Sequence, residues 1–162
     1  MTRFSPTEWY EYFIMDDWIF YNAFPEKQPG DDGYESYRKR LDQTGKEYLG
    51  TDISYILQCA DGRVYYNSGL HNHDSDLRSR DLNENEDVLL FAGCNLPLFE
   101  HINYMRYQDI RVDGNYVFFT VYVNGFLPVD SWRGHEEYKA HYRVCNDGSG
   151  LIKINEDYLC QK

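Results

Sequence analysis

The segment Arg111–Phe126, with the sequence RVDGNYVFFTVYVNGF, constrains the possible folds more than any other part of this chain. It is dense in β-branched and aromatic residues, which is typical of a β-strand. A strand with one face in water alternates apolar and polar residues. Here large side chains occupy both faces: Val117, Phe119, Val121 and Val123 on one, and Tyr116, Phe118, Thr120 and Tyr122 on the other. The fold must therefore provide cover for the tyrosine-bearing face as well.

A two-residue turn at Asp113-Gly114 is favoured by its residue types, and it would place Ile110 opposite Val117. The valine-bearing face is then apolar enough to predict a homodimer interface. The tyrosine-bearing face mixes polar groups with aromatic walls, which is typical of a small-molecule pocket. A register slip of one residue would exchange the two faces. In this register the tyrosine-bearing face also carries His101, Asn103, Met105, Tyr107 and Asp109.

Helices are expected before this segment. SPTEWYEYFIMDDWIFYNAF, residues 5–24, opens with a capping box and carries aromatic residues at helical spacing. A second helix is expected over residues 34–48, and a short third in EDVLLFAG, residues 86–93. DISYILQC and VYYN, joined by a turn in ADGR, indicate a first hairpin, and residues 101–126 and 137–159 indicate two more. Residues 68–81 are expected to form a long loop.

Helices followed by a long antiparallel sheet predict an α+β fold. We expect one domain over residues 1–162, since a chain of this length buries a core of its own. The pattern shows no internal repeat and no linker. The expected architecture is a cone-shaped α+β barrel, in which a curved antiparallel sheet wraps around the N-terminal helices.

The chain is acidic, with 27 Asp and Glu residues against 16 Lys and Arg and a net charge of −11. This charge disfavours binding to nucleic acid and to anionic membrane surfaces. It leaves open an acidic inhibitor or immunity-type protein that docks on a basic partner. The N-terminus shows no signal-peptide pattern and the four cysteines are scattered, so we expect a soluble, cytoplasmic protein with free thiols.

Two segments, FEHINYMRYQDIRVDGNYVFFTVYV and EYKAHYRVCNDGSGLIKINEDYL, resemble the later strands of the nuclear transport factor 2-like superfamily, including its polyketide cyclase (SnoaL-like) and scytalone dehydratase-like groups. The resemblance covers most of the chain in the order of elements and few residues in identity. It implies a cofactor-independent dehydratase, isomerase or cyclase that acts on a small ring-containing substrate in an aromatic-lined cavity. It also implies that His101 is a cavity histidine and that Tyr55 holds a substrate oxygen.

His101 is the candidate general acid–base, because imidazole titrates near neutral pH, and Asp17 is a candidate to orient it or to act as base. A structural histidine at a strand start is the alternative. Candidate substrate-binding residues are Asn103, Tyr107, Tyr122 and His141. The HNHDSD segment, residues 71–76, is too short and flexible a cluster to predict a metal, so no metal and no cofactor is expected. The alternatives to a lyase or isomerase are a non-catalytic ligand-binding or dimerisation module and the acidic inhibitor.

Overall fold

The computed structural model describes residues 12–23, 35–50, 53–68, 76–93, 96, 101–126 and 136–155, with the backbone alone for residues 101–104, 126 and 136. The described elements are β-strands throughout, so the expected α+β cone is wrong. Among the described residues there is no helix long and apolar enough to cross a membrane.

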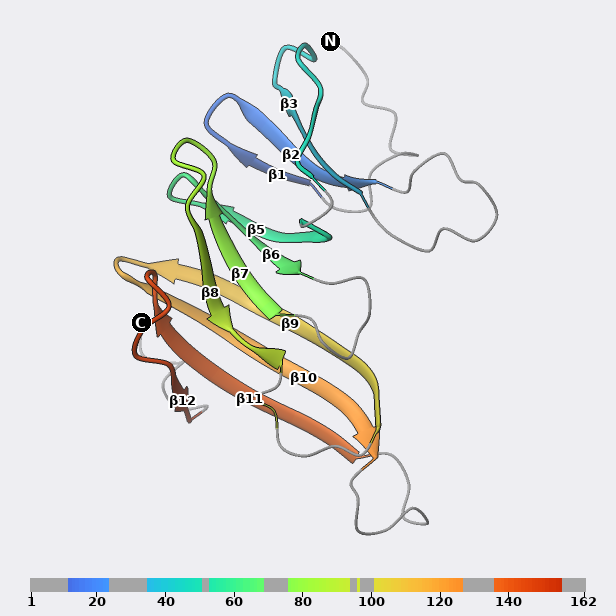
Figure 1. Ribbon diagram of the computed structural model, residues 1–162, viewed down its shortest axis with the longest axis vertical. Helices are drawn as coiled ribbons and strands as arrows, with labels where there is room; N and C mark the ends of the chain where they lie inside the picture. Colours follow the sequence, from blue (N-terminus) through green and yellow to red (C-terminus); the bar gives the residue numbers. More distant parts are fainter. Residues whose placement is uncertain are drawn as a thin grey trace.

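The strands form three antiparallel sheets of four strands each, and in every sheet consecutive strands are neighbours (Figure 1). Sheet A contains β1 (Tyr12–Met15), β2 (Trp18–Ala23), β3 (Glu35–Arg40) and β4 (Glu47–Tyr48). Sheet B contains β5 (Tyr55–Ala60), β6 (Arg63–Ser68), β7 (Asp76–Asp81) and β8 (Asp87–Phe91). Sheet C contains β9 (His101–Asp113), β10 (Tyr116–Phe126), β11 (Glu136–Cys145) and β12 (Ile152–Ile154).

The first expected helix is a hairpin in its described part. Asp16 and Asp17 form the turn between β1 and β2, with Asp16 at a φ of 54°, a conformation that Asp tolerates better than most residues. Neighbouring residues Ile19 and Phe20 are both buried, on opposite faces of the strand. Because both faces of β2 are buried, apolar residues occur at odd-numbered and even-numbered positions alike. In the sequence, this pattern is hard to distinguish from the spacing of an amphipathic helix.

The other two expected helices are also strands. Residues 34–48 contain β3 and β4, and residues 86–93 contain β8. The long loop expected over residues 68–81 includes β7 at its end, whereas residues 69–75 lie outside the described part. The three hairpins predicted from turn chemistry, β5–β6, β9–β10 and β11–β12, are confirmed.

The β9–β10 register differs from the prediction. Val117 pairs with Val112 rather than Ile110, so the turn residues are Gly114 and Asn115. A bulge then shifts the pairing by one residue. Phe118 pairs with Arg111, whereas Thr120, two residues later, pairs with Gln108. The bulge exchanges the two faces of β9 beyond it, because side chains alternate along a strand.

The three sheets are repeats, which the sequence pattern did not reveal. The turn β3–β4 and the turn β11–β12, far apart in the sequence, share the same hydrogen bonds. Asp42 Oδ1 accepts from the backbone N and the Oγ1 of Thr44 at 2.9 and 2.6 Å. Asp147 Oδ1 accepts from the N and Oγ of Ser149 at 2.9 and 2.6 Å. The residue between each pair, Gln43 or Gly148, has a positive φ of 72° or 82°.

Equivalent positions define two faces in each sheet. The front face of each sheet is the side that carries the third residue of its second strand, which is Phe20 in sheet A, Tyr65 in sheet B and Phe118 in sheet C. The back face carries the fourth residue of that strand, which is Tyr21, Tyr66 and Phe119 respectively. The front face of sheet A packs on the back face of sheet B, where Phe20 shares a core with Val64 and Tyr66. The front face of sheet B packs on the back face of sheet C, so the stack runs head to tail.

The sheets approach one another at their first strands, since β5 contacts both β1 and β9. Figure 1 shows the three sheets layered in chain order, A, B and C. The fold described is therefore an all-β stack of three four-stranded antiparallel meanders.

The larger core lies between sheets B and C, and it covers the valine-bearing face of β10. Val117, Val121 and Val123 have no exposed surface, and Phe119 stacks on Tyr142 with ring centroids 5.6 Å apart. Tyr65 and Phe91 from sheet B share this core. The sequence-based prediction of a dimer through this face is therefore wrong, because the chain covers the face with its own sheet B.

Candidate interaction surface

The front face of sheet C, which we call the C-face, bears the tyrosines singled out in the sequence. Within the described part of the chain, no further sheet packs on it. Its β10 residues are Tyr116, Phe118, Thr120 and Tyr122, and their register partners place residues of β9, β11 and β12 on the same side. These neighbours are Arg106, Gln108, Arg111, Lys139, His141, Arg143, Ile152 and Ile154.

Guanidinium groups cover three of the rings on the C-face. Arg106 lies 4.9 Å from the ring centroid of Tyr122, Arg111 4.8 Å from that of Phe118, and Arg143 4.5 Å from that of Tyr116. Such cation–π pairs form because the ring face is negative. Arginine therefore supplies the cover that the tyrosine-bearing face requires within this chain.

A buried polar group lies at the centre of the C-face. The hydroxyl of Thr120 donates to Asp109 Oδ2 at 3.2 Å and lies 2.9 Å from His141 Nδ1. A single hydroxyl hydrogen can be donated once, so Nδ1 of His141 carries the hydrogen of the second bond. Thr120 and His141 are buried, with 1% and 6% exposure.

The bulge in β9 lies beside this group and turns Arg106, rather than Tyr107, toward the C-face. Asp109 has a φ of 53° and lies in the stretch where the pairing shifts. Without the shift, Tyr107 would share a face with Tyr122. With it, Tyr107 faces the core between sheets B and C, where burial raises its pKa, whereas Tyr122 stays on the C-face, where a hydrogen bond to Glu137 raises its pKa.

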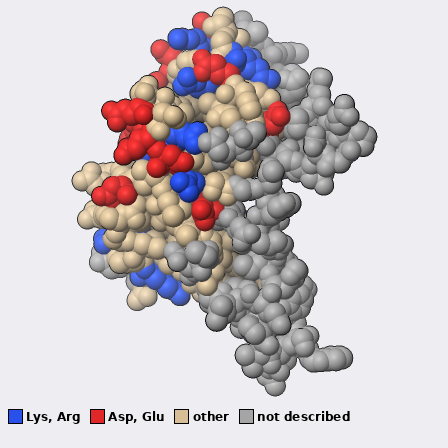
Figure 2. Space-filling model, viewed as in Figure 1, with Lys and Arg blue, Asp and Glu red and all other residues tan. Residues whose placement is uncertain are grey.

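The C-face is locally basic in an acidic chain. It carries four cations, Arg106, Arg111, Lys139 and Arg143, against three carboxylates, Asp109, Asp113 and Glu137. Figure 2 shows Asp and Glu side chains interspersed with Lys and Arg over sheets A and B, and Lys and Arg side chains at the end formed by β11 and β12. The Nε of Arg143 is buried and has no hydrogen-bond partner among the described residues.

The sequence-predicted catalytic residues are distributed over three sheets. Asp17 is exposed in the β1–β2 turn of sheet A, and Tyr55 is the first residue of β5 in sheet B. His101 begins β9 in sheet C opposite Phe126, and its side chain, like that of Asn103, lies outside the described part. The structure does not bring Asp17 and Tyr55 together, and an acid–base role for His101 stays a prediction.

The predicted substrate-binding residues are partly brought together. Tyr122 and His141 share the C-face, on neighbouring strands. Tyr107 lies on the opposite face of the same sheet. The signal that finds the C-face in the sequence is the aromatic strand itself, whereas Arg106 could not be assigned to it without the bulge.

A second candidate is a shallow hollow between the hairpin ends of sheets A and B, lined by residues that include Trp18, Arg40 and Asn83. The guanidinium groups of Arg38 and Arg40 lie 4.3 and 4.8 Å from the ring of Trp18. Arg38 also pairs with Glu47 at 2.6 Å. The hollow contains Asp16 and Asp17 as well, so its charges are mixed and select no ligand.

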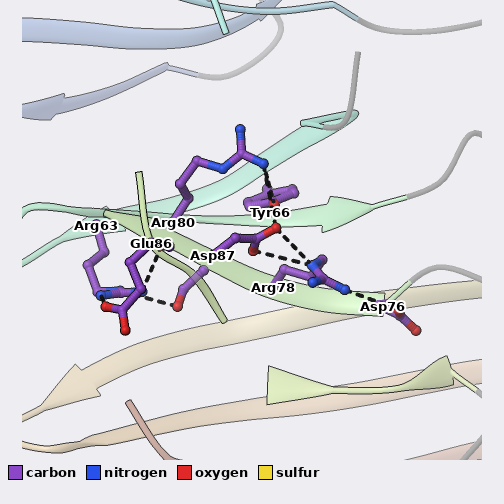
Figure 3. Close-up of polar contacts among 8 residues, drawn as sticks. Arg63, Tyr66, Asp76, Arg78, Arg80, Glu86 and Asp87 are labelled. Carbon is purple, nitrogen blue, oxygen red and sulfur yellow. Dashed lines mark hydrogen bonds and ion pairs between the residues drawn. The ribbon is translucent and has the colours of Figure 1, made fainter. Parts of the chain in front are cut away.

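A third candidate is the cluster of charged residues on sheet B (Figure 3). Arg78 pairs with Asp87 at 3.3 Å and Asp76 at 3.7 Å, and Arg63 pairs with Glu86 at 3.3 Å. Arg80 lies 3.4 Å from the hydroxyl of Tyr66, whose pKa burial raises to about 12. Opposite charges pair throughout, so this cluster fastens β7 to β8 and β6 rather than presenting a free charge.

The described residues contain no group of three or more His, Cys, Asp or Glu side chains that could hold a metal ion. His71 and His73 of the HNHDSD segment lie outside them. A scan of the chain against protein-family models found no match, and neither did a search of the curated proteins.

Proposed function

We propose that the chain is a non-catalytic binding module that contacts a protein partner through the C-face. The observation that carries this proposal is the set of three arginine–aromatic pairs around the buried Thr120–His141 pair, to which the exposed Asp109 is bonded. Tyrosine and arginine are the residues most enriched at the energetic centres of protein interfaces. On the C-face, each arginine side chain is held against an aromatic ring, so these side chains lose little conformational entropy when they bind a partner.

The position of the C-face in the repeat also supports this proposal. The equivalent faces of sheets A and B each pack on another sheet. The exposed fractions of Tyr116 and Ile152, 39% and 43%, leave apolar surface in water on the C-face. Exposed apolar surface with a polar rim is typical of a binding site.

The test uses peptides selected from a random display library on the immobilised chain. We expect peptides that protect the amides of β10 and β11 from hydrogen exchange, and an affinity that falls at least roughly tenfold in Arg143→Glu, as at an interface hot spot. Lys153→Glu is the matched control, because Lys153 pairs with Tyr142 and so points to the other side of sheet C. Peptides that bind Arg143→Glu as tightly as the unchanged chain would refute the C-face as the binding surface.

A further inference from the structure

The end of the C-face near the β9–β10 turn is accessible in the single chain. Phe118 pairs with Arg111 on one side and with Arg143 on the other, and Arg143 pairs with Ile152, so these four residues form a row across the sheet. Tyr116 lies next to this row on β10. Tyr116 and Ile152 are 39% and 43% exposed, and Arg111 is exposed as well. A partner can therefore reach this group of five residues, which we call the arginine row.

The two guanidinium groups of the arginine row lack a counter-charge. Arginines on sheets A and B pair with Asp or Glu at distances between 2.6 and 3.5 Å, as seen for Arg38, Arg63, Arg78 and Arg80. Arg111 and Arg143 form no ion pair with any described residue, and each lies instead over an aromatic ring. In a chain of net charge −11, these two cations are left for an anion from outside the chain.

Burial makes the missing counter-charge costly at Arg143. Its Nε is buried and has no hydrogen-bond partner among the described residues. A cation that is partly removed from water is stabilised by an anion or by hydrogen bonds, and the ring of Tyr116 at 4.5 Å supplies only part of this stabilisation. The N–H donors of a guanidinium match an oxyanion, which accepts two parallel hydrogen bonds from it. Arg143 is therefore prepared for an oxyanion ligand.

The positions of the two guanidinium groups favour a single compact ligand. Arg111 lies 4.8 Å from the ring centroid of Phe118, and Arg143 lies over the ring of Tyr116. Tyr116 and Phe118 are successive residues on one face of β10, and a strand rises about 3.3 Å per residue, so their Cα atoms lie about 7 Å apart. The two arginines thus cover neighbouring rings. One phosphate group between them can accept hydrogen bonds from both.

Neighbouring carboxylates disfavour an extended acidic segment as the ligand. Asp109 and Asp113 are exposed and lie on β9 on either side of Arg111. Carboxylates spread along a peptide would approach these two side chains, and like charges repel one another. A phosphate group carries about two negative charges at one point, so it can contact both arginines without extending to either carboxylate.

We propose that the arginine row binds a phosphotyrosine in an exposed segment of the protein partner. This inference rests on the proposed function of the C-face and names the chemistry of its partner. The phosphate lies between Arg111 and Arg143, and the phenyl ring packs on the exposed side chain of Ile152, the neighbour of Arg143 on β12. Recognition of phosphorylated segments by clustered arginines is a general mode of peptide binding. The rings of Tyr116 and Phe118 hold the two arginines in position beforehand.

The experiment measures how three synthetic peptide libraries bind the immobilised 162-residue chain. The libraries share the same random flanking positions and differ in the fixed central residue, which is phosphotyrosine, tyrosine or glutamate. We expect selected phosphotyrosine peptides to bind at least roughly tenfold more tightly than the same peptides with tyrosine or glutamate, because hydrogen bonds between two ionised groups are the strong ones. Hydrogen exchange of the β10 and β11 amides shows where each peptide binds.

The matched variants are Arg111→Gln and Lys153→Gln, which remove one positive charge each. Arg111 is exposed on the C-face, whereas Lys153 pairs with Tyr142 and points to the other side of sheet C. Arg111→Gln should reduce the advantage of phosphotyrosine over tyrosine at least roughly fivefold, and Lys153→Gln should leave it unchanged. Thermal unfolding checks that both variants fold like the unchanged chain.

The possible failures are distinguishable. Tyrosine and phosphotyrosine peptides that bind equally and protect β10 and β11 would overturn the phosphate site and keep the proposed function. Glutamate peptides that bind as tightly as phosphotyrosine peptides would overturn the choice of a phosphate. An equal loss of the advantage in Lys153→Gln would show that net charge rather than the arginine row is responsible, and would overturn the inference. Peptides that bind without protecting β10 and β11 would overturn both this inference and the proposed function.

Discussion

At the scale of single residues, Asn22 adds directional contacts to the apolar packing between sheets A and B. Phe20 and Tyr66 pack in the core between these two sheets. The two hydrogen bonds of Asn22 with Ile56 are directional and connect residues of sheets A and B that lie 34 positions apart in the sequence. Asn22 is fully buried, so these bonds are made away from competing water.

Asn22→Ala should therefore lower the free energy of unfolding by about 2–4 kcal/mol, because it leaves the N and O of Ile56 buried without partners. Urea unfolding followed by tryptophan fluorescence measures this loss. Asn67 is the matched control, since it occupies the fifth position of β6 and its Oδ1 has no hydrogen-bond partner among the described residues. Asn67→Ala should cost less than about 1 kcal/mol. Equal losses at the two positions would contradict the role given to Asn22.

At the scale of elements, turns are the best-preserved part of the repeat. Asp42 and Asp147 close the turns before β4 and β12 by the same pair of hydrogen bonds. Turn chemistry is local, so equivalent turns form from short sequence motifs whatever packs around them. The turn β11–β12 has a second task, because a Cβ at Gly148 would lie 2.5 Å from the carbonyl oxygen of Leu89 in sheet B.

Gly148→Ala should consequently destabilise the chain more than the same change at Gly62. Both glycines have a positive φ, 82° and 75°, which costs an alanine about 1–2 kcal/mol. Nothing lies within 4 Å of a Cβ at Gly62, so Gly62→Ala measures the backbone cost alone. The loss for Gly148→Ala should be at least roughly twice as large, because sheets B and C must separate locally. Thermal unfolding measures the loss of stability in each variant. Equal losses would contradict the prediction and would show that the backbone of Leu89 moves aside at little cost.

At the scale of the whole molecule, the three sheets are unequally supported. Among the described residues, thirteen are buried in the core between sheets B and C, and five in the core between sheets A and B. In repeat proteins, each unit is stabilised by its own contacts and those with its neighbours. Sheet A has one neighbouring sheet and the smaller core among the described residues, so we expect it to be the least stable of the three sheets.

Native-state hydrogen exchange should show this order. Amides of β2 and β3 should be protected at least roughly tenfold less than those of β6 and β10, because local opening follows local stability. Uniform protection across all three sheets would mean that the stack unfolds as one unit.

The sequence by itself determined the hairpins whose turns carry Asp-Gly and the strands within residues 101–126 and 137–154, because both depend on neighbours along the chain. It did not determine the secondary structure of residues 12–23 and 35–48, since a strand buried on both faces lacks the alternation that distinguishes it from a helix. Only the tertiary structure decided what covers each face of β10. Sheet B covers the valines, and the bulge at Asp109 turns Arg106 toward Tyr122. The physical reason is that a bulge and a stacked sheet are set by packing between segments far apart in the chain, which no local pattern records.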